Sequence, residues 1–137
     1  MSETASRIGI TGVGRVAVPV TDQKRAYEFY VDKLGFEVRA DIPYGEGSDM
    51  RWLEVAAPGS PTPLAIVPPR PGAPVGIETN IILTTRDIEA SHAALRSAGV
   101  DVDDEIARMG GPVPPMVWFR DQDGNSLLLV EDSGSEQ

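Results

Sequence analysis

The stretch that decides the fold is "GRVAVPVTDQKRAYEFYVDKLGFEV", Gly14 to Val38. Its valines alternate at positions 16, 18 and 20, as in a strand with one buried face. Asp22 is a helix-start signal, and Gly35 stands where a helix commonly ends in a left-handed residue. The stretch therefore predicts a strand, a helix and a second strand. Arg15 opens the first strand on the face opposite the valines, so its role depends on what that face contacts.

The same order of features recurs in "TNIILTTRDIEASHAALRSAGVDV", Thr79 to Val102. Asp22 follows Arg15 by seven residues, and Asp87 follows Asn80 by the same seven. Later, "MRWLEV" (50–55) matches "MVWFRD" (116–121), again at an offset of about 65 residues. A unit that recurs at a fixed offset indicates two tandem copies of one module.

Each copy is predicted to be β-α-β-β-β. The fold class is therefore α+β, with two βαβββ modules that form a curved, cup-shaped and mostly antiparallel sheet with helices on its outer face. The first module covers residues 8–68, a stiff proline-rich linker covers 69–76, and the second module covers 77–132, all within one compact domain. The predicted helices and strands are, in order, helices 22–34 and 87–98, and strands 13–20, 36–42, 49–56, 62–68, 78–84, 100–107, 115–121 and 126–131.

Alternation along the strands separates two faces of the sheet. One face is uniformly apolar and is predicted to meet the helices; it carries Val16, Val18, Val20, Leu53, Val55, Leu64, Ile66, Ile81, Leu83, Val117, Phe119, Leu127 and Leu129. The other face mixes aromatic, aliphatic and charged side chains; it includes Arg15, Ala17, Met50, Trp52, Glu54, Ala65, Asn80, Ile82, Met116, Trp118, Arg120 and Leu128. Mostly apolar walls with a few convergent polar groups are typical of a ligand cavity.

The composition excludes several classes of function. The formal net charge of −9 argues against a nucleic-acid partner and against an anionic membrane surface. The chain has no cysteine, which excludes disulfides, thiolate catalysis and cysteine zinc sites. No apolar run approaches a membrane span and no signal peptide is visible, so we expect a cytoplasmic protein.

The motif "D-x-x-x-A-x-x-F-Y-x-x-x-L-G-F-E", Asp22 to Glu37, and the later "FRDQDGNSLLLVE" resemble the vicinal oxygen chelate superfamily, the group of glyoxalase I, bleomycin-resistance proteins and extradiol dioxygenases. The resemblance covers residues 12–132. It implies a cup built from paired βαβββ modules and, in many members, a homodimer. It leaves the activity open, because such a fold carries lyases, isomerases, dioxygenases, thiol transferases and drug-binding proteins.

Enzymes of that family hold a divalent metal on the cup face through His, Glu or Gln. The resemblance places the corresponding positions of this sequence at Arg15, Asn80 and Leu128, and near Ala65. None of these residues is a carboxylate or an imidazole, and arginine brings a fixed positive charge instead of a metal ligand. We therefore expect no metal and no cofactor at the usual site.

The inner-face residues have structural alternatives as well as functional ones. Arg15 is expected either to bind a ligand carboxylate, phosphate or enolate or to form an ion pair with Glu54. Trp52 and Trp118 are expected as aromatic walls around a flat ligand, or as cavity or dimer filling. Glu54 is a candidate general base as well as an ion-pair partner.

The remaining residues have more limited expectations. Asn80 is expected to orient a ligand or to cap the local backbone. Arg120 is expected to bind ligand or to pair near the rim with Asp121 or Asp123. His92, the one histidine, is expected to be a partly buried helix residue away from the cup. Met50, Met116 and Leu128 are expected as apolar contacts for the ligand, whereas Tyr44 lies in a glycine-containing loop that could move and is not assigned to the site.

The sequence thus predicts a metal-free protein that binds an aromatic or drug-like molecule in the cup, as bleomycin-resistance proteins do. One alternative is an enzyme, a lyase, isomerase or dioxygenase that uses Glu54 with an arginine or a displaced divalent metal. Another is an interaction module whose inner face is buried by dimerisation.

Overall fold

The structure is a computed structural model that describes residues 8–132. The first half of this range contains a short α-helix continued by a π-helix, and the second half contains one α-helix. The elements are β1 (Val16–Pro19), α2 (Gln23–Tyr27), η1 (Glu28–Lys33), β2 (Glu37–Pro43), β3 (Arg51–Ala56), β4 (Leu64–Val67), β5 (Glu78–Thr85), α3 (Ile88–Ser97), β6 (Asp101–Val102), β7 (Met116–Arg120) and β8 (Ser126–Glu131).

The strands of the described chain form two separate four-stranded sheets, in the orders β1-β4-β3-β2 and β5-β8-β7-β6. The β1–β4 and β5–β8 pairs are parallel and the other pairs are antiparallel, so the predicted α+β class and the twofold repeat are confirmed. The two sheets do not close into one, because the edge strands β1 and β5 do not pair with each other. The position of β1 at an edge suits Pro19, which has no N–H to donate to a neighbour.

The helices begin where the aspartates predicted. The side chain of Asp22 accepts hydrogen bonds from the backbone N–H groups of Lys24 and Arg25, and the side chain of Asp87 accepts one from Ala90. These caps satisfy N–H groups that have no partner within the helix.

The first helix is not regular along its whole length, which corrects the prediction of one helix over 22–34. In η1 the N–H of Leu34 donates to the carbonyl of Phe29, five residues earlier. The wider turn accommodates two consecutive aromatic side chains in the core, because Phe29 and Tyr30 are both buried with their ring centroids 5.0 Å apart.

The core lies between the sheets and the helices. Every strand residue predicted to face the helices belongs to one hydrophobic cluster, either buried within it or packed against it. The predicted helix stripe also contributes, through buried Ala26, Phe29 and Tyr30 and half-buried Leu34. Phe29 stacks on Phe119 at a centroid distance of 6.5 Å, so the first helix packs against the second module as well as its own.

The predicted strand 100–107 is much shorter in the structure. Only Asp101 and Val102 pair with β7, and a single bridge joins Ala107 to Met116 further on. Asp103 still contacts β7, because its N–H donates to the carbonyl of Trp118 and its carboxylate accepts from Arg120. Its own carbonyl bonds His92 of α3 at 2.8 Å, and Asp104 accepts from Arg96 of α3, so the chain turns toward the helix after this residue. His92 is half-buried on α3, as predicted.

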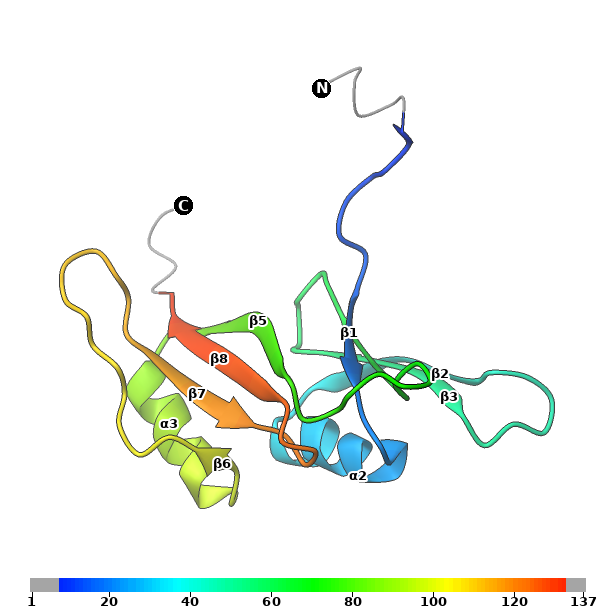
Figure 1. The fold of residues 1–137 in the computed structure, drawn as a ribbon. Coiled ribbons are helices and arrows are strands. Elements are labelled where there is room, and N and C mark those ends of the chain that lie inside the picture. Colours follow the sequence, from blue (N-terminus) through cyan, green and yellow to red (C-terminus); the bar gives the residue numbers. More distant parts are fainter. Residues whose placement is uncertain (1–7, 133–137) are drawn as a thin grey trace.

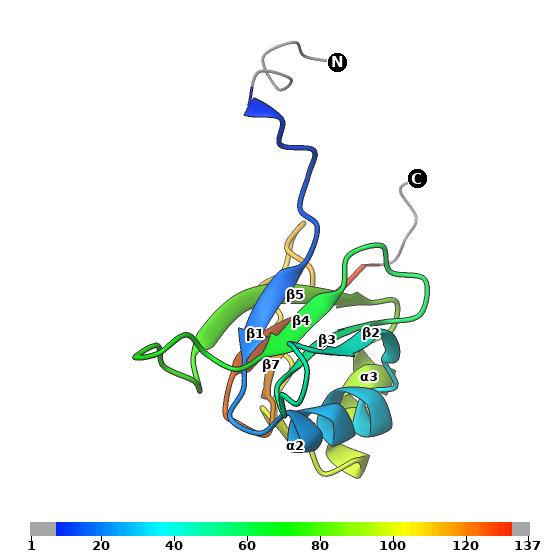
Figure 2. The same cartoon turned by 90° about the vertical axis from the view of Figure 1, so that its right-hand side faces the viewer.

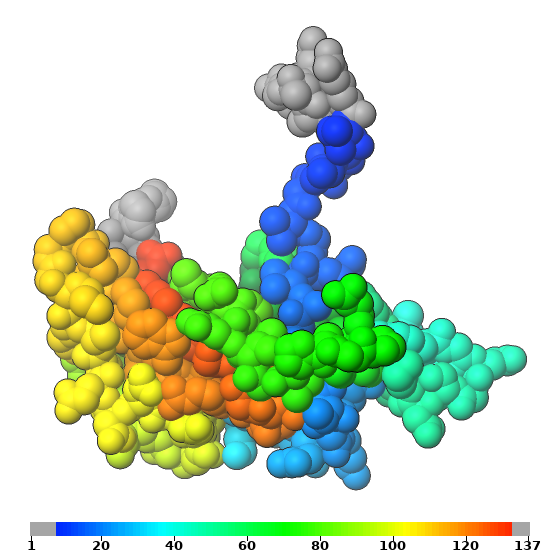
Figure 3. Space-filling model, in the orientation of Figure 1, coloured from blue at the N-terminus to red at the C-terminus, as the bar shows by residue number. Residues whose placement is uncertain are grey.

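Both helices lie on the same side of the sheets, opposite the side from which the chain before β1 departs (Figures 1 and 2). That segment projects from the body as a narrow stalk in the space-filling view (Figure 3), and its Ile8, Ile10 and Val13 are 71–75% exposed. Among residues 8–132 there is no helix with the length and apolarity required to span a membrane.

Candidate functional site

Three predicted site residues meet on the inner face of the first sheet. Arg15 Nε lies 2.6 Å from Glu54 Oε2, and Trp52 Nε1 donates a hydrogen bond of 2.6 Å to the same oxygen. The arginine also lies over the tryptophan, with Cζ 6.0 Å from the ring centroid. Arg15 therefore adopts the ion-pair alternative, because Glu54 is 6% exposed and a buried carboxylate requires such partners.

Tyr44 joins this group although sequence reasoning left it outside the site. Its ring centroid lies 6.4 Å from that of Trp52, at an interplanar angle of 46°. A signal for this contact was present, since Tyr44 continues the alternation of β2, where Ile42 stands directly opposite Trp52. We call Arg15, Tyr44, Trp52 and Glu54 the Trp52 cluster.

The second module presents a different surface at the equivalent positions. Trp118 stands opposite Leu128 on β8, which in turn stands opposite Ile82 on β5, and Met116 stands opposite Val130. These side chains form an apolar patch in which Ile82 is 59% exposed. Trp118 thus has aliphatic neighbours, whereas Trp52 has a buried carboxylate.

Asn80 lies in an irregular part of β5. The register with β8 shifts between Glu78 and Ile82, and Asn80 has φ of 62°, a left-handed conformation that asparagine tolerates. Its side chain is exposed and makes no hydrogen bond with any residue in the described range 8–132, so the predicted backbone cap is not formed.

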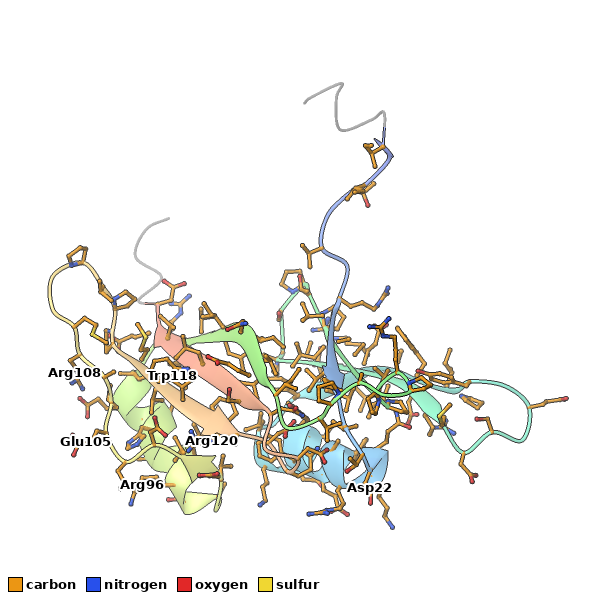
Figure 4. All side chains as sticks on the ribbon, in the orientation of Figure 1. Asp22, Arg96, Glu105, Arg108, Trp118 and Arg120 are labelled. Atoms are coloured by element: carbon orange, nitrogen blue, oxygen red, sulfur yellow. The ribbon has the colours of Figure 1, made fainter. Side chains whose placement is uncertain are left out.

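Arg120 is the site residue whose predicted partners are wrong. Instead of Asp121 or Asp123, it donates to Asp103 at 2.9 Å and to Asp101 at 3.0 Å. These hydrogen bonds raise the pKa of the Arg120 guanidinium, and the one from Arg120 to Asp101 lowers the pKa of that carboxyl. Figure 4 shows Trp118 and Arg120 along β7. The arginine joins β7 to the segment after β6 rather than offering a free cation.

Three hollows of the molecule overlap the predicted cup face only in part, at Met50, Ile82 and Arg120. These hollows, of about 840, 450 and 360 Å³, all touch a helix, and none of the three is lined by Trp52, Glu54 or Trp118. Met50, predicted on the inner face, lines the largest one together with Tyr27 of α2. Exposure on the inner face varies from residue to residue, from 59% at Ile82 to 6% at Glu54.

The motif "DQDGN" (121–125) has a structural role that the sequence did not predict. Asn125 is fully buried; its amide nitrogen donates to the carbonyl of Pro19 and to Asp121, and its oxygen accepts from the N–H groups of Gly76 and Ile77. Buried Asp121 also accepts from the hydroxyl of Tyr30 at 2.8 Å. Residues of both modules and of the segment between them thus meet at one hydrogen-bonded point.

Two pKa shifts belong to this junction. Burial raises the pKa of the Tyr30 hydroxyl far above its usual range, and the charge of Asp121 adds to the effect. Partial burial opposes ionisation of Asp123, but hydrogen bonds from Thr21 and from Gln122 outweigh it and lower the pKa of that carboxyl. The two pKa values shift in opposite directions because burial dominates at the Tyr30 phenol, whereas the hydrogen bonds together outweigh burial at the Asp123 carboxyl.

The usual metal positions of the superfamily do not fit a metal in this chain. Arg15 is occupied by its contact with Glu54, the side chains of Ala65 and Leu128 have no donor atom, and Asn80 offers a single amide oxygen. Within residues 8–132 there is also no cluster of three or more His, Cys, Asp or Glu side chains that could hold a metal ion. A divalent ion needs several oxygen or nitrogen donors around it, and these positions do not supply them.

The comparison with known families agrees with this architecture. The profile of the Glyoxalase/Bleomycin resistance protein/Dioxygenase superfamily matches residues 12–129. The chain belongs to this superfamily. The paired modules and the helices on one side of both sheets are thus those of a superfamily member, and the resemblance predicted from "DxxxAxxFYxxxLGFE" is confirmed.

Similar proteins within the superfamily include one described as binding an antibiotic. TnmS3, an antibiotic binding protein from Streptomyces sp. CB03234, is 37% identical with a TM-score of 0.76, covering 91% of this chain and 98% of that one. A superfamily member from Sphaerobacter thermophilus DSM 20745 is 34% identical, also with a TM-score of 0.76, covering 90% and 98%. The uncharacterized protein YetH of Bacillus subtilis (strain 168) is 35% identical over 123 residues, covering 89% of this chain and 99% of that protein.

Proposed function

We propose that this superfamily member binds a flat aromatic or drug-like molecule on its inner face and uses no metal. The observation that carries the proposal is the Trp52 cluster. The resemblance puts Arg15 at a metal-ligand position of the superfamily, and here its guanidinium lies over the Trp52 ring and is engaged by Glu54 at 2.6 Å. Similarity to an antibiotic binding protein supports the same conclusion.

The proposal includes closure of the site by a second copy in a homodimer. One chain leaves apolar side chains in the open, among them Ile42 at 57% and Ile82 at 59% exposure, and its N-terminal stalk projects from the body with Ile8 and Ile10. Exposed apolar surface of this kind marks a binding or interaction face. A second inner face placed over the first would give the enclosed, mostly apolar cavity that drug-sized ligands require.

Thermal unfolding in the presence of flat aromatic compounds and antibiotics tests the binding function. A ligand at one hundred times its Kd stabilises the native state by about 2.7 kcal/mol, so a micromolar binder raises the Tm measurably. The shift should disappear in Trp52→Ala and persist in Tyr27→Ala, an aromatic deletion on the surface of α2.

Two results would overturn this function. One is a set of Tm shifts that Trp52→Ala leaves unchanged. The other is one divalent metal per chain, measured by native mass spectrometry with elemental analysis and lost in a variant of Arg15, Asn80 or Leu128. A protein that stays monomeric in sedimentation at every concentration would refute the homodimer alone.

A further inference from the structure

The Glu54 carboxylate uses only one of its two oxygens. Both Arg15 Nε and Trp52 Nε1 lie 2.6 Å from Oε2, and no residue between 8 and 132 donates a hydrogen bond to Oε1. An ionised carboxylate offers about four acceptor positions on its two oxygens, and buried polar groups normally find partners. A residue only 6% exposed thus keeps free acceptor capacity.

The neighbouring strands offer this oxygen no side-chain donor. Glu54 stands opposite Ala65 on β4 and opposite Ala40 on β2, and Ala65 stands opposite Ala17 on β1. Methyl side chains cannot donate a hydrogen bond, and they are too short to fold over a neighbouring carboxylate. The row of alanines therefore places no donor beside Glu54, and Ala65 itself is only 1% exposed. Oε1 is not among the fully buried, unpaired side-chain polar atoms of residues 8–132, so it keeps contact with solvent, and Ala17 at the end of the row is exposed.

The aromatic wall next to this oxygen has a fixed orientation. The Trp52 ring is held by its N–H bond to Glu54, by the Arg15 guanidinium over its face and by the Tyr44 ring beside it. A site whose groups are already ordered loses little entropy when it binds. The distance from the stacking surface to the free acceptor is consequently set before a ligand arrives.

We propose that the Trp52 cluster selects flat aromatic molecules that carry a hydroxyl or amine donor, with that donor bonded to Glu54 Oε1. The selection rests on the proposed function and adds the chemistry of the ligand to it. It also decides against a ligand carboxylate or phosphate at this position, because the positive charge of Arg15 is already balanced by Glu54 and a second anion beside Glu54 would be repelled.

The second module lacks the carboxylate acceptor on which this selection depends. The counterpart of Glu54 in the repeat is Arg120, which Asp101 and Asp103 hold. Trp118 therefore has no carboxylate acceptor two residues along its strand. It can stack on a ring, but it offers no equivalent discrimination between donor-bearing and donor-free ligands.

Three probes of the same ring system test the proposal: 2-naphthol, its methyl ether 2-methoxynaphthalene, and 2-naphthoate. Binding is followed by NMR through the indole N–H signals of the two tryptophans, which Trp118→Phe assigns. We expect 2-naphthol to shift the Trp52 signal and to bind at least about 10-fold tighter than the ether, which corresponds to one good hydrogen bond of about 1.4 kcal/mol. The naphthoate should bind no tighter than the ether.

Glu54→Gln is the decisive variant. Arg15 and Trp52 both donate, so the amide oxygen takes the place of Oε2 and the NH₂ group takes the place of Oε1. The preference for 2-naphthol over the ether should vanish in this variant, whereas the affinity for the ether should stay the same. Retained binding of the ether also shows that the variant is folded. Glu105→Gln removes the same charge from an exposed residue near α3 (Figure 4), and it should preserve the wild-type preference.

The outcomes separate this proposal from the function on which it rests. Equal affinity of the wild-type chain for 2-naphthol and its ether overturns the donor selection and leaves aromatic binding intact. A failure of all three probes to perturb either indole signal at millimolar concentration overturns aromatic binding and the selection together. If Glu54→Gln does not fold, the comparison of probes on the wild-type chain decides alone.

Discussion

Replacing Asn125 with alanine should be among the most destabilising single changes outside the apolar core. The side chain is fully buried and makes four hydrogen bonds, to Pro19, Gly76, Ile77 and Asp121. Alanine removes all four and leaves their partners unpaired at a junction of both modules. At about 1 kcal/mol for each bond, the loss is about 4 kcal/mol, a large share of the roughly 5–15 kcal/mol that stabilises a typical domain.

Urea unfolding followed by circular dichroism measures this loss. With a slope of about 2 kcal/mol per molar urea, the midpoint should fall by about 2 M. Asn125→Asp is the matched variant: it retains the accepting oxygen for Gly76 and Ile77, loses both donors and places a second carboxylate beside Asp121. Because two such carboxylates favour sharing a proton, its stability should recover relative to the alanine variant as the pH falls toward about 5.

A loss below about 1 kcal/mol for Asn125→Ala would refute this reasoning. It would mean that water replaces the amide without cost and that the junction does not hold the modules together. A difference between the Asp and Ala variants that does not change with pH would refute the contact with Asp121 in particular.

Three further predictions concern the same junction. Tyr30→Phe removes a hydrogen bond to the buried Asp121 carboxylate and should lower the free energy of unfolding by about 1.5–3 kcal/mol, measured by urea unfolding, whereas an unchanged value would show that the phenol contributes nothing. Gly76→Ala should lower the urea midpoint of unfolding more than Gly72→Ala does. Both glycines have positive φ, but only at Gly76 would a Cβ lie 2.9 Å from the backbone oxygen of Asp123. Equal urea midpoints for the two variants would contradict this close approach. Because the pKa of Asp123 is lowered in the native state, the ionised carboxylate stabilises the fold above about pH 4, and this effect is lost as the pH falls through the lowered native pKa. Asp123→Asn should therefore have a lower free energy of unfolding than wild type at neutral pH, and the difference should disappear in acid. A difference in the free energy of unfolding that stays constant from about pH 7 to about pH 2 would argue against this effect.

Much of the candidate site was accessible from the sequence because it depends on local periodicity. Alternation placed Trp52 and Glu54 on one face of one strand and Arg15 on the same face of the sheet, so their meeting could be predicted. The contact of Tyr44 with Trp52 depends on the register of the β2–β3 hairpin, which the glycine-containing loop between them obscured.

The partners of the remaining charged residues could not be predicted in this way. Arg120 pairs with Asp101 and Asp103 because the chain leaves β7 after only two residues of β6, and alternation alone predicted a longer strand. The separation of the two sheets is a second example: the pattern of apolar and polar residues is the same whether the two sheets join or remain apart.

The sequence by itself determined what depends on near neighbours along the chain: the caps at Asp22 and Asp87, the face that each strand buries, and the repeat of one module. The tertiary structure alone decided what depends on how the modules dock. Tyr30 reaches Asp121, and Pro19 reaches Asn125, across gaps of 91 and 106 residues. Such contacts form only after two separately patterned surfaces have packed, and periodicity within either surface carries no information about which side chains will then meet.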